Sequence, residues 1–115
     1  MLKSIRNAIF GLRYVWATQR NIRVQFFVFV LVIIAGFLFG ISAIQWIFVL
    51  SACFFVIGAE IFNTSVEKLV DLIESKRNLN CKLIKDIAAG FVLVVCVYAL
   101  AVGGIVFIPK IIALL

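Results

Sequence analysis

The sequence predicts an all-α integral membrane protein, in which an N-terminal amphipathic surface helix precedes three transmembrane helices. Of its 115 residues, 66% are hydrophobic and only 14% are charged, and the mean hydropathy is +1.27. A soluble domain carries about 25% charged residues, and one of this length cannot bury so much apolar surface in water. These observations exclude a soluble enzyme, a nucleic-acid-binding domain and a disordered chain. Residues 1–115 are expected to form a single membrane domain.

Residues 1–22 are predicted to form the surface helix. Ile5, Ile9, Leu12 and Trp16 recur at helical spacing, while most of the basic residues lie elsewhere around the helix. Such a helix lies in the membrane interface with its aromatic residue at headgroup depth. The scattered charges argue against a cleavable signal peptide.

The three helices that contain the transmembrane spans are predicted at 24–40, 44–74 and 85–109. The segment from Val24 to Ala59 is uncharged and too long for a single crossing of about 20 residues. A turn is therefore expected near Gly36, Gly40, Ser42, Gln45 and Trp46. The second helix continues beyond the membrane, a polar loop covers 75–80, and the uncharged segment 87–109 forms the third span, with Pro109 at its outer end.

The positive charge is strongly asymmetric. With three spans, the N-terminus and the second connection share one side of the membrane, and all of the 11 basic residues except Lys110 fall on that side. The positive-inside rule makes this side cytoplasmic. The sequence has no histidine, and its three cysteines show neither zinc-ligand spacing nor an even number for disulfides.

A polar stripe marks the inner end of the second span. Residues 60, 63, 64, 67 and 71 fall within about 100° of one helix face and comprise Glu60, Asn63, Thr64, Glu67 and Asp71. Carboxylates near lipid are costly and usually functional, and Lys85 and Asp86 enter the third span at a similar depth. The structural alternative is that these groups only join helices by hydrogen bonds. Carboxylates and a lysine without histidine favour Mg²⁺ and phosphate chemistry, with Glu60 suited to the role of general base.

The run from Glu60 to Asp71 resembles the signature of the small prokaryotic diacylglycerol kinase family, which includes undecaprenol kinases. The similarity extends from Lys3 to Lys110 and includes the Lys85–Gly90 segment. It implies a homotrimer in the bacterial cytoplasmic membrane that transfers the γ-phosphoryl group of ATP to the hydroxyl of a membrane lipid, diacylglycerol or undecaprenol, with Mg²⁺. Its active sites would lie between subunits and face the cytoplasm.

The resemblance also implies a role for each site residue. Glu60 would be the catalytic base, Glu67 and Gln19 would hold the metal, and Asn63, Thr64 and Asp71 would support the site or the substrate. The nucleotide would contact a wider set, namely Asn7, Gln19, Glu67, Lys76, Arg77, Asn78, Lys85 and Asp86.

Two positions depart from the family pattern. Gln19 stands where a metal-binding glutamate is usual, so the metal affinity is expected to fall, and Asn7 replaces a nucleotide-contacting tyrosine. One alternative is therefore a weakened or inactive homologue that acts as a membrane scaffold. Another, less favoured, is a small proton-coupled transporter, which would need about four spans and a more deeply placed acid.

Overall fold

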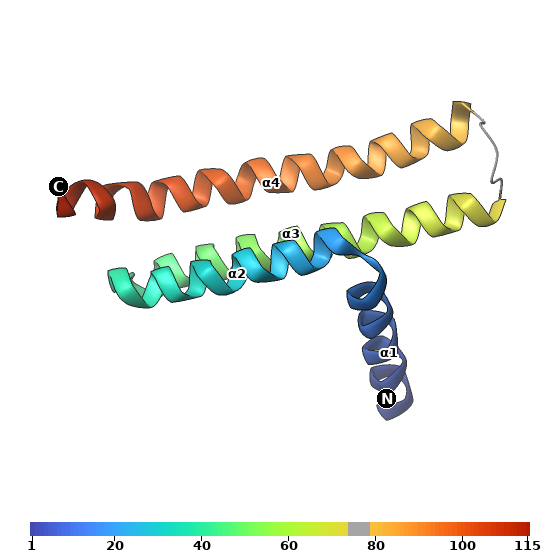
Figure 1. The fold of residues 1–115 in the computed structure, drawn as a ribbon, viewed down its shortest axis with the longest axis horizontal. Coiled ribbons are helices and arrows are strands. Elements are labelled where there is room, and N and C mark those ends of the chain that lie inside the picture. Colours follow the sequence, from blue (N-terminus) through green and yellow to red (C-terminus); the bar gives the residue numbers. More distant parts are fainter. Residues whose placement is uncertain (74–78) are drawn as a thin grey trace.

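The structure is a computed structural model that describes residues 1–73 and 79–115. Within these ranges it contains four helices, α1 (Leu2–Thr18), α2 (Arg20–Phe39), α3 (Ala43–Ile73) and α4 (Leu79–Leu114). The last three run side by side, with α3 antiparallel to both α2 and α4, and α1 runs crosswise to them (Figure 1). All three are long and apolar enough to cross a membrane, so the predicted all-α membrane fold with a separate N-terminal helix is confirmed.

The surface helix ends earlier than predicted, at Thr18 rather than at residue 22. Gln19 adopts an extended conformation, and α2 begins directly after it. The guanidinium of Arg23 donates to the carbonyl oxygens of Trp16, at 2.6 Å, and Ala17, at 3.3 Å. Because the last carbonyls of a helix have no partner within it, this side chain stabilises the end of α1 and the bend that follows.

The predicted turn between the first two spans is confirmed. Gly40 has φ +61°, a left-handed conformation that glycine adopts without steric cost, and the Ile41 N–H donates to the Gly36 carbonyl. Ser42 and Gln45 then form a reciprocal capping box: the Ser42 N–H donates to Gln45 Oε1 at 2.9 Å, and the Gln45 N–H donates to Ser42 Oγ at 3.2 Å. This box begins α3.

Helix α4 is longer than predicted at both ends. It begins at Leu79 instead of residue 85. An ion pair of 2.6 Å between Lys82 and Asp86 joins successive turns near this end of the helix. The helix also continues past Pro109, which we expected to mark its end. Proline removes only one backbone donor, and membrane helices tolerate this loss.

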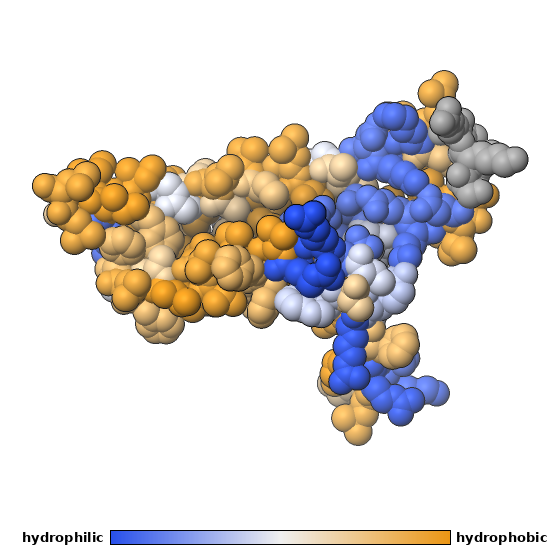
Figure 2. Space-filling view, viewed as in Figure 1, coloured by the Kyte–Doolittle hydropathy of each residue, from blue (hydrophilic) through white to orange (hydrophobic). Residues whose placement is uncertain are grey.

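Apolar and polar residues separate along the bundle (Figure 2). An apolar core of Ile41, Val49 and Val106 lies near the turn between α2 and α3. Hydrophilic residues gather at the opposite end, where α1 joins α2, α3 ends and α4 begins. We call this the polar end of the bundle.

Candidate functional site

The polar stripe predicted on the second span lies on α3, toward the polar end. Glu60, Asn63 and Thr64 are buried, and each of these residues is only 4–6% exposed to solvent. Glu67 is half-buried and Asp71 is exposed. The stripe therefore runs along α3 from the interior of the bundle outward.

Glu60 is the deepest acid of this stripe. Gln25, on α2, donates from its Nε2 to Glu60 Oε2 at 3.4 Å. Two turns of α3 separate Glu60 from Glu67, which corresponds to about 10 Å along the helix. Thr64 donates from its hydroxyl to the Glu60 backbone carbonyl at 2.9 Å, which gives this threonine a local structural role.

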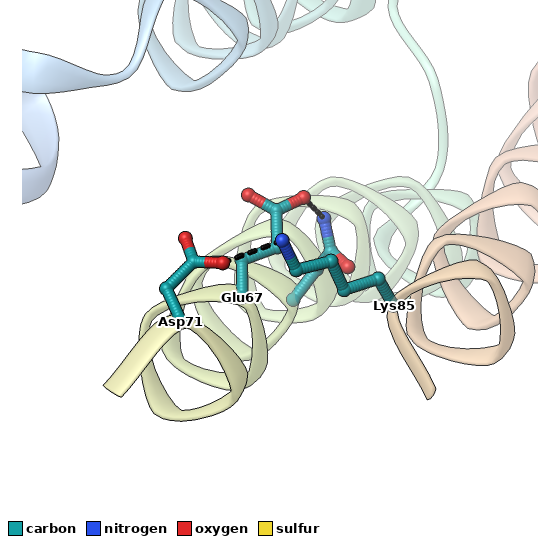
Figure 3. Close-up of polar contacts among 4 residues, drawn as sticks. Glu67, Asp71 and Lys85 are labelled. Carbon is teal, nitrogen blue, oxygen red and sulfur yellow. Dashed lines mark hydrogen bonds and ion pairs between the residues drawn. The ribbon is translucent and has the colours of Figure 1, made fainter. Parts of the chain in front are cut away.

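The next two acids are held by separate partners. Asn63 donates from its Nδ2 to Glu67 Oε1 at 3.2 Å. Lys85, on α4, donates to Asp71 Oδ1 at 2.5 Å. Figure 3 shows Lys85 reaching across from its own helix to Asp71, with Glu67 beside this contact on α3. Two helices thus place a cation beside two carboxylates.

Lys85 remains a cation under ordinary conditions. It precedes the uncharged segment 87–109 and so lies outside the membrane-spanning part of α4. Its hydrogen bond to Asp71 raises the pKa of the Lys85 ammonium above the usual 10.5. Since a raised pKa favours the protonated form, the positive charge of Lys85 persists well above neutral pH.

The structure does not unite all the predicted site residues. Asn7 lies exposed on α1, and Gln19 lies at the bend between α1 and α2. Among the described residues, neither side chain makes a polar contact with the acids of α3. Asp86 pairs with Lys82 on its own helix. Lys76, Arg77 and Asn78 lie outside the described residues.

Gln25 is the site residue that sequence analysis missed. Its signal was weak, because Gln25 lies only two residues after Arg23, at the polar start of the first apolar segment. The sequence spacing alone does not show that this position of α2 faces Glu60.

The donor set fits a magnesium ion that is shared with phosphate groups. The described residues contain no group of three or more histidine, cysteine or acidic side chains that would hold a metal by themselves. However, Asn63 Oδ1 is buried without a hydrogen-bond partner, and it belongs to the residue that holds Glu67. Mg²⁺ takes oxygen ligands and is commonly bound through one or two carboxylates together with substrate phosphates. Glu67 and Asn63 would supply such ligands.

The sequence of this chain matches a known protein family. Residues 6–107 match the family described as prokaryotic diacylglycerol kinase. The chain is 39% identical to a diacylglycerol kinase from Synechocystis sp. over all of its own length and 66% of that protein. It is 34% identical to an undecaprenol kinase from Bacillus subtilis over 94% of its own length and 88% of that protein. The chain thus spans about two thirds of the first relative and most of the second.

Proposed function

Because the chain belongs to the prokaryotic diacylglycerol kinase family, we propose that it is a lipid kinase that uses ATP and Mg²⁺. It transfers the γ-phosphoryl group of ATP to the hydroxyl of a membrane lipid, either diacylglycerol or undecaprenol. The observation that carries this proposal is the buried Glu60 carboxylate. Gln25 of α2 donates a hydrogen bond to it, and it lies on the same face of α3 as Glu67 and Asp71.

The burial gradient along α3 supports a reaction between a lipid and a nucleotide. Glu60 is the acid nearest the apolar part of the bundle, where a lipid hydroxyl would arrive. Glu67 and the Asp71–Lys85 pair lie progressively closer to the polar end, where a water-soluble nucleotide would bind. A base at the boundary and charged groups beyond it match the positioning and charge neutralisation that dominate phosphoryl transfer.

In the proposed reaction, Glu60 accepts the proton of the lipid hydroxyl. The lipid oxygen forms a bond to the γ-phosphorus of ATP, the bond from that phosphorus to the β–γ bridging oxygen breaks, and ADP leaves. Lys85 and Asp86 bind and orient the nucleotide. Mg²⁺ bound at Glu67 and Asn63 would neutralise charge on the phosphate oxygens.

The proposed setting is a homotrimer in the bacterial cytoplasmic membrane, with the polar end facing the cytoplasm. The basic residues support this orientation, since all but Lys110 lie at or near the polar end or in the connection after α3. Within one chain, Asn7 and Gln19 do not reach the acidic stripe. A site that uses them is therefore best built between subunits.

The transporter alternative is not favoured. It would need about four spans, whereas the described residues contain three helices that are candidates for crossing a membrane.

The test is transfer of labelled γ-phosphate from ATP to diacylglycerol or undecaprenol, offered separately in detergent or bilayers with Mg²⁺. We expect the wild-type protein to label one of them, and Glu60→Gln to lower the rate by about 10²- to 10⁴-fold. Ser65→Ala serves as the control, because this exposed hydroxyl bonds only to the Ile61 carbonyl of its own helix.

Full activity of Glu60→Gln would remove Glu60 from the role of base. Binding of ATP by the wild-type protein without labelling of either lipid would instead favour the inactive scaffold.

A further inference from the structure

We propose that Gln25 is a second group of the lipid-binding site, which positions Glu60 and receives the lipid hydroxyl. Its amide nitrogen holds the Glu60 carboxylate, and its amide oxygen accepts a hydrogen bond from the hydroxyl before Glu60 takes the proton. This inference rests on the proposed function, because it assigns to Gln25 a part in the same reaction.

The first observation is the direction of the amide. Gln25 turns its Nε2 toward Glu60, whose Oε2 accepts a hydrogen bond from it at 3.4 Å. This orientation leaves Gln25 Oε1 pointing elsewhere. That oxygen is buried and has no hydrogen-bond partner.

The second observation is where Gln25 lies. It lines an apolar groove of about 480 Å³ between α2, α3 and α4, whose other walls include Phe29, Val49, Cys53 and Phe107. Apart from cysteines, every other described residue lining this groove is apolar or glycine. Gln25 therefore brings the main polar group of the groove next to Glu60.

These observations together indicate a missing donor. A buried amide oxygen without a partner is unfavourable, and the surrounding apolar side chains offer no strong donor. The alcohol of a membrane lipid carries one O–H group above a hydrocarbon tail, so it matches both the unpaired oxygen and the apolar groove.

The docked hydroxyl then needs only to rotate about its C–O bond for its proton to point to Glu60. No covalent bond changes in this docking step. In the transfer that follows, the proton passes to Glu60 as the bond from oxygen to phosphorus forms. Gln25 keeps its own protons throughout.

The test compares Gln25→Met with the wild-type protein in the phosphoryl-transfer assay. Methionine has a similar volume and lacks both the donor and the acceptor. We expect kcat/KM for the lipid to fall about 10- to 100-fold, as for the loss of a hydrogen bond to a charged group. The KM for ATP and the thermal unfolding temperature should stay at wild-type values. Gln45→Met is the matched control, because Gln45 makes its contacts at the Ser42 turn, at the other end of the bundle.

A double-mutant cycle separates positioning from a structural effect. If Gln25 acts with Glu60, Gln25→Met should cause little further loss in a Glu60→Gln background. If Gln25→Met does not fold, Gln25→Leu, which also lacks the amide donor and the amide acceptor, takes its place with the same expected loss.

Wild-type kcat/KM in an active Gln25→Met protein would overturn the role of Gln25 and leave the kinase intact. A parallel rise in the KM for ATP with a lower unfolding temperature, or losses that simply add in the cycle, would also overturn it. Absence of phosphorylation by the wild-type protein would overturn both the proposed function and this inference.

Discussion

Lys85 on α4 lies 2.5 Å from Asp71 on α3, measured between Nζ and Oδ1, and this ion pair joins the two helices at the polar end of the bundle. The lysine side chain is 37% exposed and the aspartate side chain 57%. Because exposed pairs contribute little to folding stability, we interpret this one through the charge that it places beside Glu67. In the proposed kinase, Lys85 turns from Asp71 to a phosphate oxygen of ATP.

Lys85→Met should therefore weaken nucleotide binding. A charge-assisted hydrogen bond to a phosphate is lost, so the KM for ATP should rise about 10-fold or more. The unfolding temperature should change little. Lys110→Met is the matched control, because Lys110 lies on the same helix at the other end of the bundle. Equal effects of the two substitutions would contradict a specific role for Lys85, and steady-state kinetics at varied ATP would show it.

Gln19→Glu should strengthen the proposed magnesium site. A carboxylate offers the metal a negative charge that the amide lacks. We expect the Mg²⁺ concentration for half-maximal rate to fall by up to about 10-fold. Gln45→Glu adds the same charge at the other end of the bundle and should leave this requirement unchanged. A metal titration of the rate that gave the same midpoint for Gln19→Glu and wild type would exclude Gln19 from metal binding.

Arg23→Met should loosen the surface helix. The substitution leaves the Trp16 and Ala17 carbonyls without the guanidinium that they accept hydrogen bonds from. Amide hydrogen exchange in the last turn of α1 should speed up about 10-fold or more. The contact of the Lys68 ammonium with the Tyr14 ring, 4.9 Å from its centroid, should still tether α1 at Tyr14, one turn before its end. Arg20→Met serves as the control, and similar exchange in both variants would count against the capping role of Arg23.

The sequence and the structure agree best where a single helix decides the outcome. The 3.6-residue period alone places Glu60, Asn63 and Glu67 on one face of α3, and the structure confirms it. The Gly40 turn was also predictable, because its chemistry is local. Gln25 was not found, because nearly every side of α2 is apolar and its register against α3 depends on tertiary packing. The ends of α4 were predicted wrongly because local residue types were given too much weight. Polar residues near its start and Pro109 near its end suggested that the helix would be shorter, whereas it continues through both.

Gly36→Ala should destabilise the bundle where α2 meets α3. A Cβ atom at this position would lie 2.5 and 2.8 Å from two ring atoms of Trp46. The ring cannot easily retreat, because it also packs against Phe37, with ring centroids 4.9 Å apart, and against the apolar core. Overpacking of this kind costs about 1–3 kcal/mol, so thermal unfolding followed by circular dichroism should occur at a lower temperature. Gly11→Ala is the control, because no atom lies within 4 Å of a Cβ there and alanine favours the helix by up to about 1 kcal/mol. A Gly36→Ala protein as stable as wild type would show that the Trp46 ring does not require the bare backbone of Gly36.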